Sequence, residues 1–218
     1  PVLTAWNAHD IIEENFKYYF GRPGTVGDRP GNLILQNSDL LIVLGSRLNI
    51  RQIGYNWEAF AREAKIIMVD IDQNELEKHT LSIDYPFQDD LKSFLSKILK
   101  NELKGFNEKS DWISYCKNVK KNYPVFNPDY KKTKKINPYY FMHELSDALK
   151  EDQVIVSADG TACVSAFQEI KIKKGQRLYT NSGCASMGYE LPASIGAWQD
   201  NKKEIICIAG DGSIMMNI

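Results

Sequence analysis

Four consecutive residues, Gly210, Asp211, Gly212 and Ser213, have the types and spacing to bind a phosphorylated ligand. They follow the apolar run 205–209, which predicts a buried strand of a parallel sheet. Ligands of open α/β sheets bind at the carboxyl ends of such strands. A carboxylate there is a hard oxygen ligand for Mg²⁺, and glycines let a phosphate reach main-chain N–H groups. The tetrapeptide alone fits a tight turn with an aspartate cap equally well.

A second predicted strand, at 153–157, ends in a similar way. It leads into Asp159, Gly160 and Thr161, so glycine, a small hydroxyl residue and free N–H groups stand at the start of the next element. That combination suits a diphosphate held by backbone donors and a helix dipole. Between the two strand ends lies a stretch of small residues, 181–197, that includes Met187. By itself this stretch is typical of a loop followed by a tightly packed helix.

The elements that must position these residues alternate between strand-like and helix-like segments, which predicts α/β domains with parallel, doubly wound sheets. We expect strands at 1–5, 40–45, 65–72, 153–157 and 204–209. We expect helices from Ile11 (capped by Asp10), at 33–37, at 89–100, around Trp112, at 139–150 and at 188–200. The glycine-rich loop 21–28 lacks G-x-G-x-x-G spacing and is weak evidence for a nucleotide.

The pattern divides the chain into an α/β domain at 1–105, a lysine-rich connector at 106–136 and a second α/β domain at 137–218. Eleven lysines lie between residues 97 and 135. A nucleic-acid surface is the alternative interpretation of these lysines. No RNP pattern or recognition-helix signature supports it, so we expect a solvated connector and no nucleic-acid partner.

The composition is that of an ordinary globular protein. Of 218 residues, 43% are hydrophobic and 25% are charged. The formal net charge of −1 does not indicate binding to nucleic acid or to an anionic membrane. We find no signal peptide and no membrane-length apolar run, and we expect a cytoplasmic protein without a membrane partner. The cysteines lack C-x-x-C spacing and predict reduced, buried thiols without metal. The histidines lie too far apart along the chain to indicate zinc: His9, His79 and His143.

Taken together and in order, these segments resemble the thiamine diphosphate enzymes of the acetolactate synthase group. The resemblance extends over nearly the whole chain and rests on one specific combination. This is the pattern M-G-x-x-L-P-A-x-I-G-A at 187–197, followed by G-D-G-S at 210–213. It implies a Rossmann-like middle domain and a thiamine diphosphate-binding domain, both incomplete here. The implied activity is that of a Mg²⁺-dependent carboligase or decarboxylase acting on pyruvate or another 2-keto acid.

The resemblance also implies roles for single residues. Asp211 would bind Mg²⁺, Met187 would support the bent cofactor between its two rings, and the Ala185 carbonyl would accept from the aminopyrimidine amino group. The remaining cofactor-binding residues would hold the diphosphate: Gly160, Thr161, Gly210, Gly212 and Ser213. The cofactor supplies an electron sink, and the protein orients it.

A second nucleotide site is a further implication. Gly45, Arg47, Asp70 and Asp72 match segments that lie along FAD in acetolactate synthases, and an acid at a strand end is a reasonable ribose partner. However, Asn49-Ile50 replaces a pair of aspartates usual in that group, which argues against FAD. The sequences 6–10 and 45–52 are more similar to homologues from surface-polysaccharide synthesis, which leaves a keto sugar open as the acceptor.

The resemblance places the activating glutamate in a domain that this sequence lacks, and the second Mg²⁺ ligand, an asparagine, beyond Ile218. We therefore expect no catalytic residue in this chain, an inactive central fragment, and a homodimeric or homotetrameric parent enzyme. Two alternatives remain. One is a non-catalytic FAD- or NAD-binding module built on the first domain, and the other is an assembly fragment whose sheet edges other segments cover.

Overall fold

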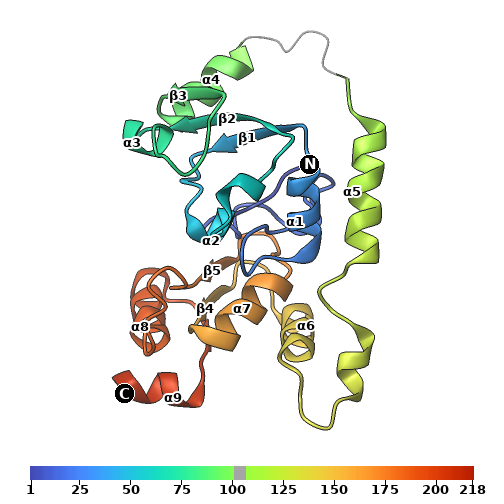
Figure 1. The fold of residues 1–218 in the computed structure, drawn as a ribbon. Helices are drawn as coiled ribbons and strands as arrows, with labels where there is room; N and C mark the ends of the chain where they lie inside the picture. Colours follow the sequence, from blue (N-terminus) through green and yellow to red (C-terminus); the bar gives the residue numbers. More distant parts are fainter. Residues whose placement is uncertain (101–106) are drawn as a thin grey trace.

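The computed structural model describes residues 1–100 and 107–218, and it contains two parallel sheets of three strands each (Figure 1). The first sheet has the order β1-β2-β3, and the second has the order β5-β4-β6. The strands are β1 (Leu40–Leu44), β2 (Lys65–Asp70), β3 (Tyr85–Gln88), β4 (Val154–Ser157), β5 (Arg177–Tyr179) and β6 (Ile205–Ile208). Helices connect the parallel strands, so the fold is α/β, as the alternation of segments predicts.

Four helices belong to the first sheet: α1 (Arg29–Gln36), α2 (Ile50–Ile53), α3 (Gln73–Leu76) and α4 (Leu91–Lys100), with a 3₁₀ turn at Trp57–Ala59. The core beneath them is apolar and includes Val43, Phe60 and Met68. Helix α1 begins at residue 29, earlier than predicted, because Asp28 caps it by accepting from the Gly31 N–H (2.6 Å).

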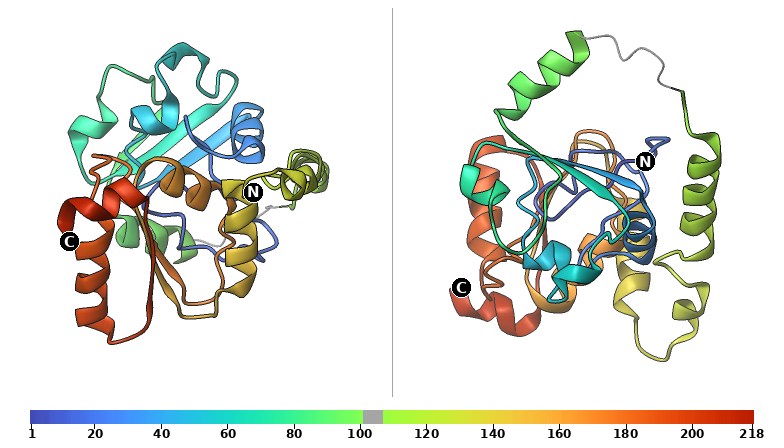
Figure 2. Two further views of the ribbon diagram at one scale, coloured as in Figure 1. Left: turned by 90° about the horizontal axis from the view of Figure 1, so that it is seen from below. Right: turned by 45° about the horizontal axis from the view of Figure 1, so that its top comes forward.

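Four helices belong to the second sheet: α6 (Pro138–Ala148), α7 (Gly160–Glu169), α8 (Glu190–Asn201) and α9 (Asp211–Ile214), with a 3₁₀ turn at Met215–Asn217. Helix α6 packs on α7, whereas α8 contacts β4 and β6. Helices α6 and α7 therefore lie apart from α8 (Figure 2). The core between α6, α7 and the sheet includes Met142, Ile155, Ala166 and Leu178. Strand β4 is the central strand of this sheet, and all four of its residues are buried, as its apolar residues on both faces predict.

The lysine-rich segment contains a well-formed helix, α5 (Ser110–Asn122), and a 3₁₀ helix at Pro128–Lys132. Helix α5 lies beside α1 (Figure 1), and its Cys116 and Val119 pack against Phe20 and Ile34. The predicted solvated connector is therefore anchored to the first unit along one face. The predicted domain boundary between residues 105 and 106 lies outside the described residues.

Residues 1–22 correct two of our predictions. The expected strand at 1–5 is only an isolated bridge between Val2 and Tyr19, and no helix begins at Ile11. Asp10 does not cap a helix, because its carboxylate accepts from the Arg177 Nε (2.8 Å) and the Leu178 N–H (2.9 Å). Contacts with the second sheet therefore override the local preference of this segment.

The thiol predictions are half right. All four cysteines are free, and Cys116 and Cys163 are buried, but Cys184 and Cys207 are exposed. Cys207 is exposed because alternate side chains of β6 point to opposite faces of the sheet, and its neighbours Ile206 and Ile208 are the ones that face the core. Burial raises the pKa of the Cys163 thiol to about 11, which keeps it protonated. Within the described residues, no helix is both long and apolar enough to span a bilayer.

Candidate functional site at the carboxyl edge of the second sheet

The two glycine-containing turns lie side by side. Strands β4 and β6 are parallel neighbours, with Ser157 opposite Ile208, and the Ala158 N–H donates to the Ile208 carbonyl (2.8 Å). The turn that begins α7 and the turn that begins α9 therefore leave the same edge of the sheet. The structure thus brings together two of the predicted groups of cofactor-binding residues, around Gly160 and around Asp211.

The first of these turns forms an open helix N-terminus. Gly160 is the first residue of the ten-residue helix α7, with φ of +60°, a conformation that favours glycine. Apart from its chain neighbours and the backbone of its own helix, no described residue has an atom within 4 Å of the position that a Cβ would take there. The N-cap residue, Asp159, makes no side-chain capping bond, and Gly160 and Thr161 are exposed. The first N–H groups of α7 are therefore available to an anion, which the helix dipole favours.

The second turn carries the predicted metal ligand. Asp211 is exposed at the start of α9, and its Oδ1 accepts from the N–H of Gly212 (2.8 Å). Across the described parts of the chain, no three or more His, Cys, Asp and Glu side chains form a group that could hold a metal ion. A single exposed carboxylate such as that of Asp211 is a suitable ligand for Mg²⁺, which commonly takes its other oxygen ligands from phosphate groups and water.

The loop containing Met187 is bound to the second turn. The Gly188 N–H donates to the Ser213 Oγ (2.9 Å), and the Asn217 Nδ2 donates to the Gly188 carbonyl (2.8 Å). The Cε of Met187 lies 4.0 Å from the position of a Cβ on Gly212, and Met187 is 45% exposed. A large apolar side chain thus stands beside the polar turn, where it can contact the apolar part of a ligand.

Ala185, also in this loop, has an unusual backbone. Its φ is +53°, and its N–H donates to the Asn181 carbonyl (2.7 Å). A left-handed conformation costs an L-residue roughly 1–2 kcal/mol, and such strain is concentrated at ligand-binding sites. The predicted acceptor role of its carbonyl therefore falls on a strained, exposed residue.

One polar residue of this region was missed by the sequence analysis. Glu190, the first residue of α8, is fully buried, and neither carboxylate oxygen has a hydrogen-bond partner among the described residues. Its position at a helix N-terminus is favourable for a negative charge. No sequence signal distinguishes it, because glutamate at the first turn of a helix is common on protein surfaces.

The candidate nucleotide residues of the first sheet also come together, but they serve local structure. The Gly45 N–H donates to the carbonyl of Val69 (3.0 Å), the residue before Asp70 in β2. Asp70 accepts from the Asp72 N–H (3.0 Å), Asp72 caps α3, and Arg47 pairs with Glu75 (2.6 Å). Each of the charged side chains thus has a structural partner.

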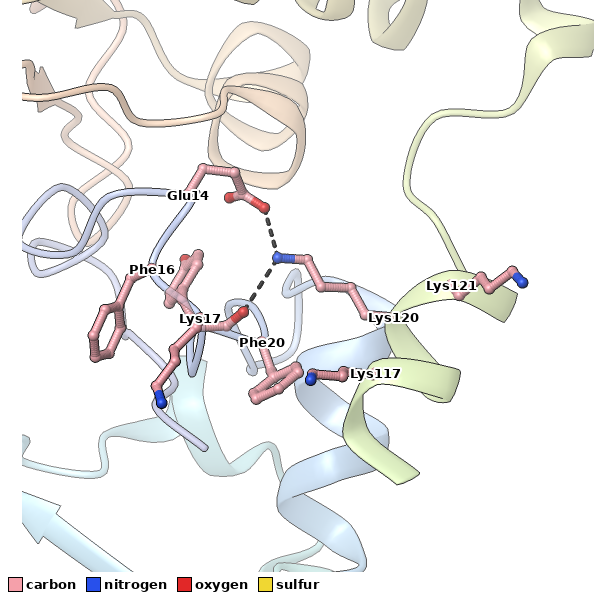
Figure 3. Close-up of a pocket in the computed structure, with 8 residues that line it drawn as sticks. Glu14, Phe16, Lys17, Phe20, Lys117, Lys120 and Lys121 are labelled. Atoms are coloured by element: carbon pink, nitrogen blue, oxygen red, sulfur yellow. Dashed lines mark hydrogen bonds and ion pairs between the residues drawn. The ribbon is translucent and has the colours of Figure 1, made fainter. Parts of the chain in front are cut away.

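A separate hollow of about 360 Å³ lies between residues 14–20 and α5 (Figure 3). The ammonium group of Lys120 crosses it and contacts the Glu14 carboxylate (2.7 Å) and the Tyr19 carbonyl (3.2 Å). None of its lining residues belongs to the strand-end turns. The contacts of Lys120 connect α5 to the N-terminal segment, and the hollow is not part of the candidate site.

The fold and the strand-end turns define a class of protein, the α/β proteins whose glycine-containing turns lie at the carboxyl edge of a parallel sheet, where such proteins bind their ligands. Residues 1–98 match the family described as "Thiamine pyrophosphate enzyme, central domain", and residues 159–218 match "Thiamine pyrophosphate enzyme, C-terminal TPP binding domain". The chain belongs to the thiamine pyrophosphate enzymes, as its motifs predict.

Several curated relatives are acetolactate synthases. The chain is 31% identical over 222 residues to the acetolactate synthase of Mycobacterium bovis, covering 99% of this chain and 35% of that protein. It is 33% identical over 222 residues to the acetolactate synthase isozyme 1 large subunit of Escherichia coli, covering 100% of this chain and 38% of that protein. The chain thus spans little more than a third of the length of these relatives.

Proposed function

We propose that this chain supplies the diphosphate side of a thiamine diphosphate and Mg²⁺ site. The observation that carries the proposal is the pair of adjacent turns at one sheet edge, an open helix N-terminus at Gly160 beside the exposed carboxylate of Asp211. Glycine with free space around it, unpaired N–H donors and an oxygen ligand are what a metal-bound diphosphate requires. The residues present therefore fit the cofactor.

The chain's own groups would act by binding and orientation. The N–H groups of Gly160 and Thr161 would bind diphosphate oxygens from one side, and the 210–213 turn would approach from the other. Asp211 would hold Mg²⁺, and Met187 would support the apolar part of the cofactor. When bound, the cofactor supplies the electron sink for reactions of 2-keto acids.

For the whole protein, we propose a carboligase or decarboxylase that acts on pyruvate or another 2-keto acid, similar to acetolactate synthase. We propose a homodimer or homotetramer in the reducing cytoplasm, with the domain division 1–105, 106–136 and 137–218. The isolated chain should not turn over substrate, because the resemblance assigns proton abstraction to a glutamate outside this sequence.

Calorimetric titration with thiamine diphosphate tests the proposal, with Mg²⁺ present and then removed by a chelator. We expect Mg²⁺-dependent binding in the natural full-length protein and its loss in Asp211→Ala. Asp72→Ala is the matched control, because this aspartate also stands after a strand but lies at the other sheet. Equal binding by Asp211→Ala and the wild type would refute the assignment.

The second candidate function is an FAD- or NAD-binding module on the first sheet. The adjacency of Gly45 and Asp70 at the end of β1 and β2 favours it. The engagement of Arg47 and Asp72 in local contacts weighs against it. Titration with FAD and with NAD separates the two candidates. A protein that binds FAD or NAD but does not bind thiamine diphosphate would support the nucleotide-binding module.

A further inference from the structure

Helix α7 is held at its C-terminal end by a residue from the other half of the chain. Arg22 is 2% exposed, and its guanidinium donates to the carbonyls of Phe167 and Ile170, the latter at 2.7 Å. Its Nε donates to the hydroxyl of Tyr19 (2.9 Å). Each guanidinium nitrogen therefore has an acceptor, and two of these acceptors belong to the end of α7.

These two carbonyls need a donor. The last carbonyls of a helix have no partner within the helix and carry the negative end of its dipole. Around the Arg22 side chain, the described residues place no carboxylate within ion-pair distance, and the acceptors are neutral oxygens. The cost of burying this cation is offset in large part by the end of α7.

The backbone of Arg22 is itself fixed. Its N–H donates to the Oδ2 of Asp28 (2.7 Å), and Asp28 caps α1. Cβ atoms on two neighbouring glycines would clash with it, at 2.2 Å from its carbonyl oxygen for Gly27 and 2.7 Å from its nitrogen for Gly31. Close packing around Arg22 therefore accounts for Gly27 and for Gly31 in α1. The other two glycines of the loop 21–28 also lie in tight packing, since a Cβ on Gly21 would meet Asp28 and a Cβ on Gly24 would meet Arg51.

A second contact supports the same junction. The ring of Trp6 stacks on that of Phe167, with centroids 3.7 Å apart. Residues 1–22 thus contact the C-terminal turn of α7 through both a cation and an aromatic ring. The opposite end of this helix, about 15 Å away at 1.5 Å per residue, is the open N-terminus at Gly160.

We propose that Arg22 is a positioning residue for the diphosphate site. It fixes α7 along its axis, so that the N–H groups of Gly160 and Thr161 stay at the sheet edge beside Asp211. Its charge at the C-terminal end also complements an anion at the N-terminal end of the same helix. Arg22 acts only through α7, and the inference rests on the proposed function of that N-terminus.

The test compares Arg22→Met and Arg22→Lys with a matched control, Arg177→Met. Arg177 is another cation that joins residues 1–22 to the second sheet, through Asp10, but it lies on β5 and not on α7. The dissociation constants of thiamine diphosphate and of inorganic pyrophosphate are measured at fixed Mg²⁺ in the natural full-length protein, well below each variant's melting temperature.

We expect Arg22→Met to weaken both ligands by about five- to tenfold, equivalent to about 1–1.4 kcal/mol. Arg22→Lys should recover part of the loss, because one ammonium can reach one carbonyl. If Arg22→Met does not fold, the comparison is made between Arg22→Lys and the wild type. Arg177→Met should stay within about twofold of the wild type, as surface substitutions do.

Hydrogen exchange gives a readout that does not need the cofactor. Without ligand, the amides of the first turn of α7 should exchange faster in Arg22→Met than in Arg177→Met. Wild-type affinity and exchange in both Arg22 variants would overturn the inference. Absence of binding by the wild type would instead refute the proposed function.

Discussion

The buried side chain of His9 makes the stability of this protein depend on pH. His9 is fully buried, its Nε2–H donates to the Leu178 carbonyl (2.8 Å), and its Nδ1 has no partner among the described residues. The pKa of His9 is lowered to about 4, chiefly by burial and next by the nearby charge of Arg22, which outweigh the hydrogen bond to Leu178 and the charge of Asp10 that raise it. The folded protein therefore keeps this ring neutral at pH values where an unfolded chain protonates it.

The sign of the effect follows from proton uptake. As pH falls below about 6.5, the unfolded chain binds a proton at His9, whereas the folded protein does so only near pH 4, so stability falls across that window. For these two pKa values, the free energy of unfolding should lose about 2 kcal/mol between pH 7.5 and pH 5 through this group alone.

Urea unfolding of the wild type and of His9→Gln between pH 5 and pH 7.5 measures this loss. Glutamine keeps a donor near the position of Nε2 and does not titrate. Burial raises the pKa values of Asp28 and Glu169, which makes them act in the opposite direction, but both proteins contain them and their effect cancels in the difference. A difference between the two proteins that changes by less than about 0.5 kcal/mol across this range would refute the reasoning.

Three other substitutions test the candidate site. Gly160→Ala should cost about 1–2 kcal/mol of stability by urea unfolding, because φ is +60°, and should weaken Mg²⁺-dependent pyrophosphate binding, because the new methyl group enters the space for the anion. Unchanged pyrophosphate affinity would remove Gly160 from the site. Met187→Ala should leave pyrophosphate binding by calorimetry within about twofold but lower turnover in the full-length enzyme, since the proposed role of its side chain is to support the apolar part of the cofactor. An equal loss of both would contradict this role. Glu190→Met should raise the free energy of unfolding by about 1 kcal/mol, because both oxygens of this buried side chain lack a hydrogen-bond partner among the described residues. Destabilisation would reveal a partner for the carboxyl group.

The parts of the fold with a strong periodic signal were predictable from sequence. Helix α4 follows the apolar spacing of its residues, and β1, β2, β4 and β6 correspond to short, continuous apolar runs. Two strands were missed for physical reasons. Strand β3 contains Pro86, all of its residues are exposed, and it lies at the edge of its sheet, where proline is tolerated. Strand β5 has three residues, too few to show a period.

The segment 1–22 could not be predicted, because its structure depends on partners far away in the sequence. Asp10 has the residue type and position of a helix cap, yet it bonds to Arg177 and Leu178. The sequence separation of 169 residues between His9 and Leu178 leaves no local pattern to detect. A local preference worth about 1 kcal/mol for a cap is outweighed by contacts with the second half of the chain. These contacts are the hydrogen bonds of Asp10 and Arg22 and the stacking of Trp6 on Phe167.

The candidate site shows the opposite relation between sequence and structure. Its residues lie at the ends of strands, and parallel strands place their carboxyl ends at a common edge, so two turns separated by 50 residues become neighbours once β4 pairs with β6. Sequence order and residue type therefore predicted a common edge for these turns, and the resemblance to the thiamine diphosphate enzymes predicted that Gly160 and Asp211 are neighbours. They could not reveal what holds the turns in place, because Arg22 acts from the far end of α7 and belongs to a loop whose glycines resemble a ligand-binding motif. Residues that touch a ligand follow from the topology of the sheet, whereas residues that position them follow from packing between the two halves of the chain.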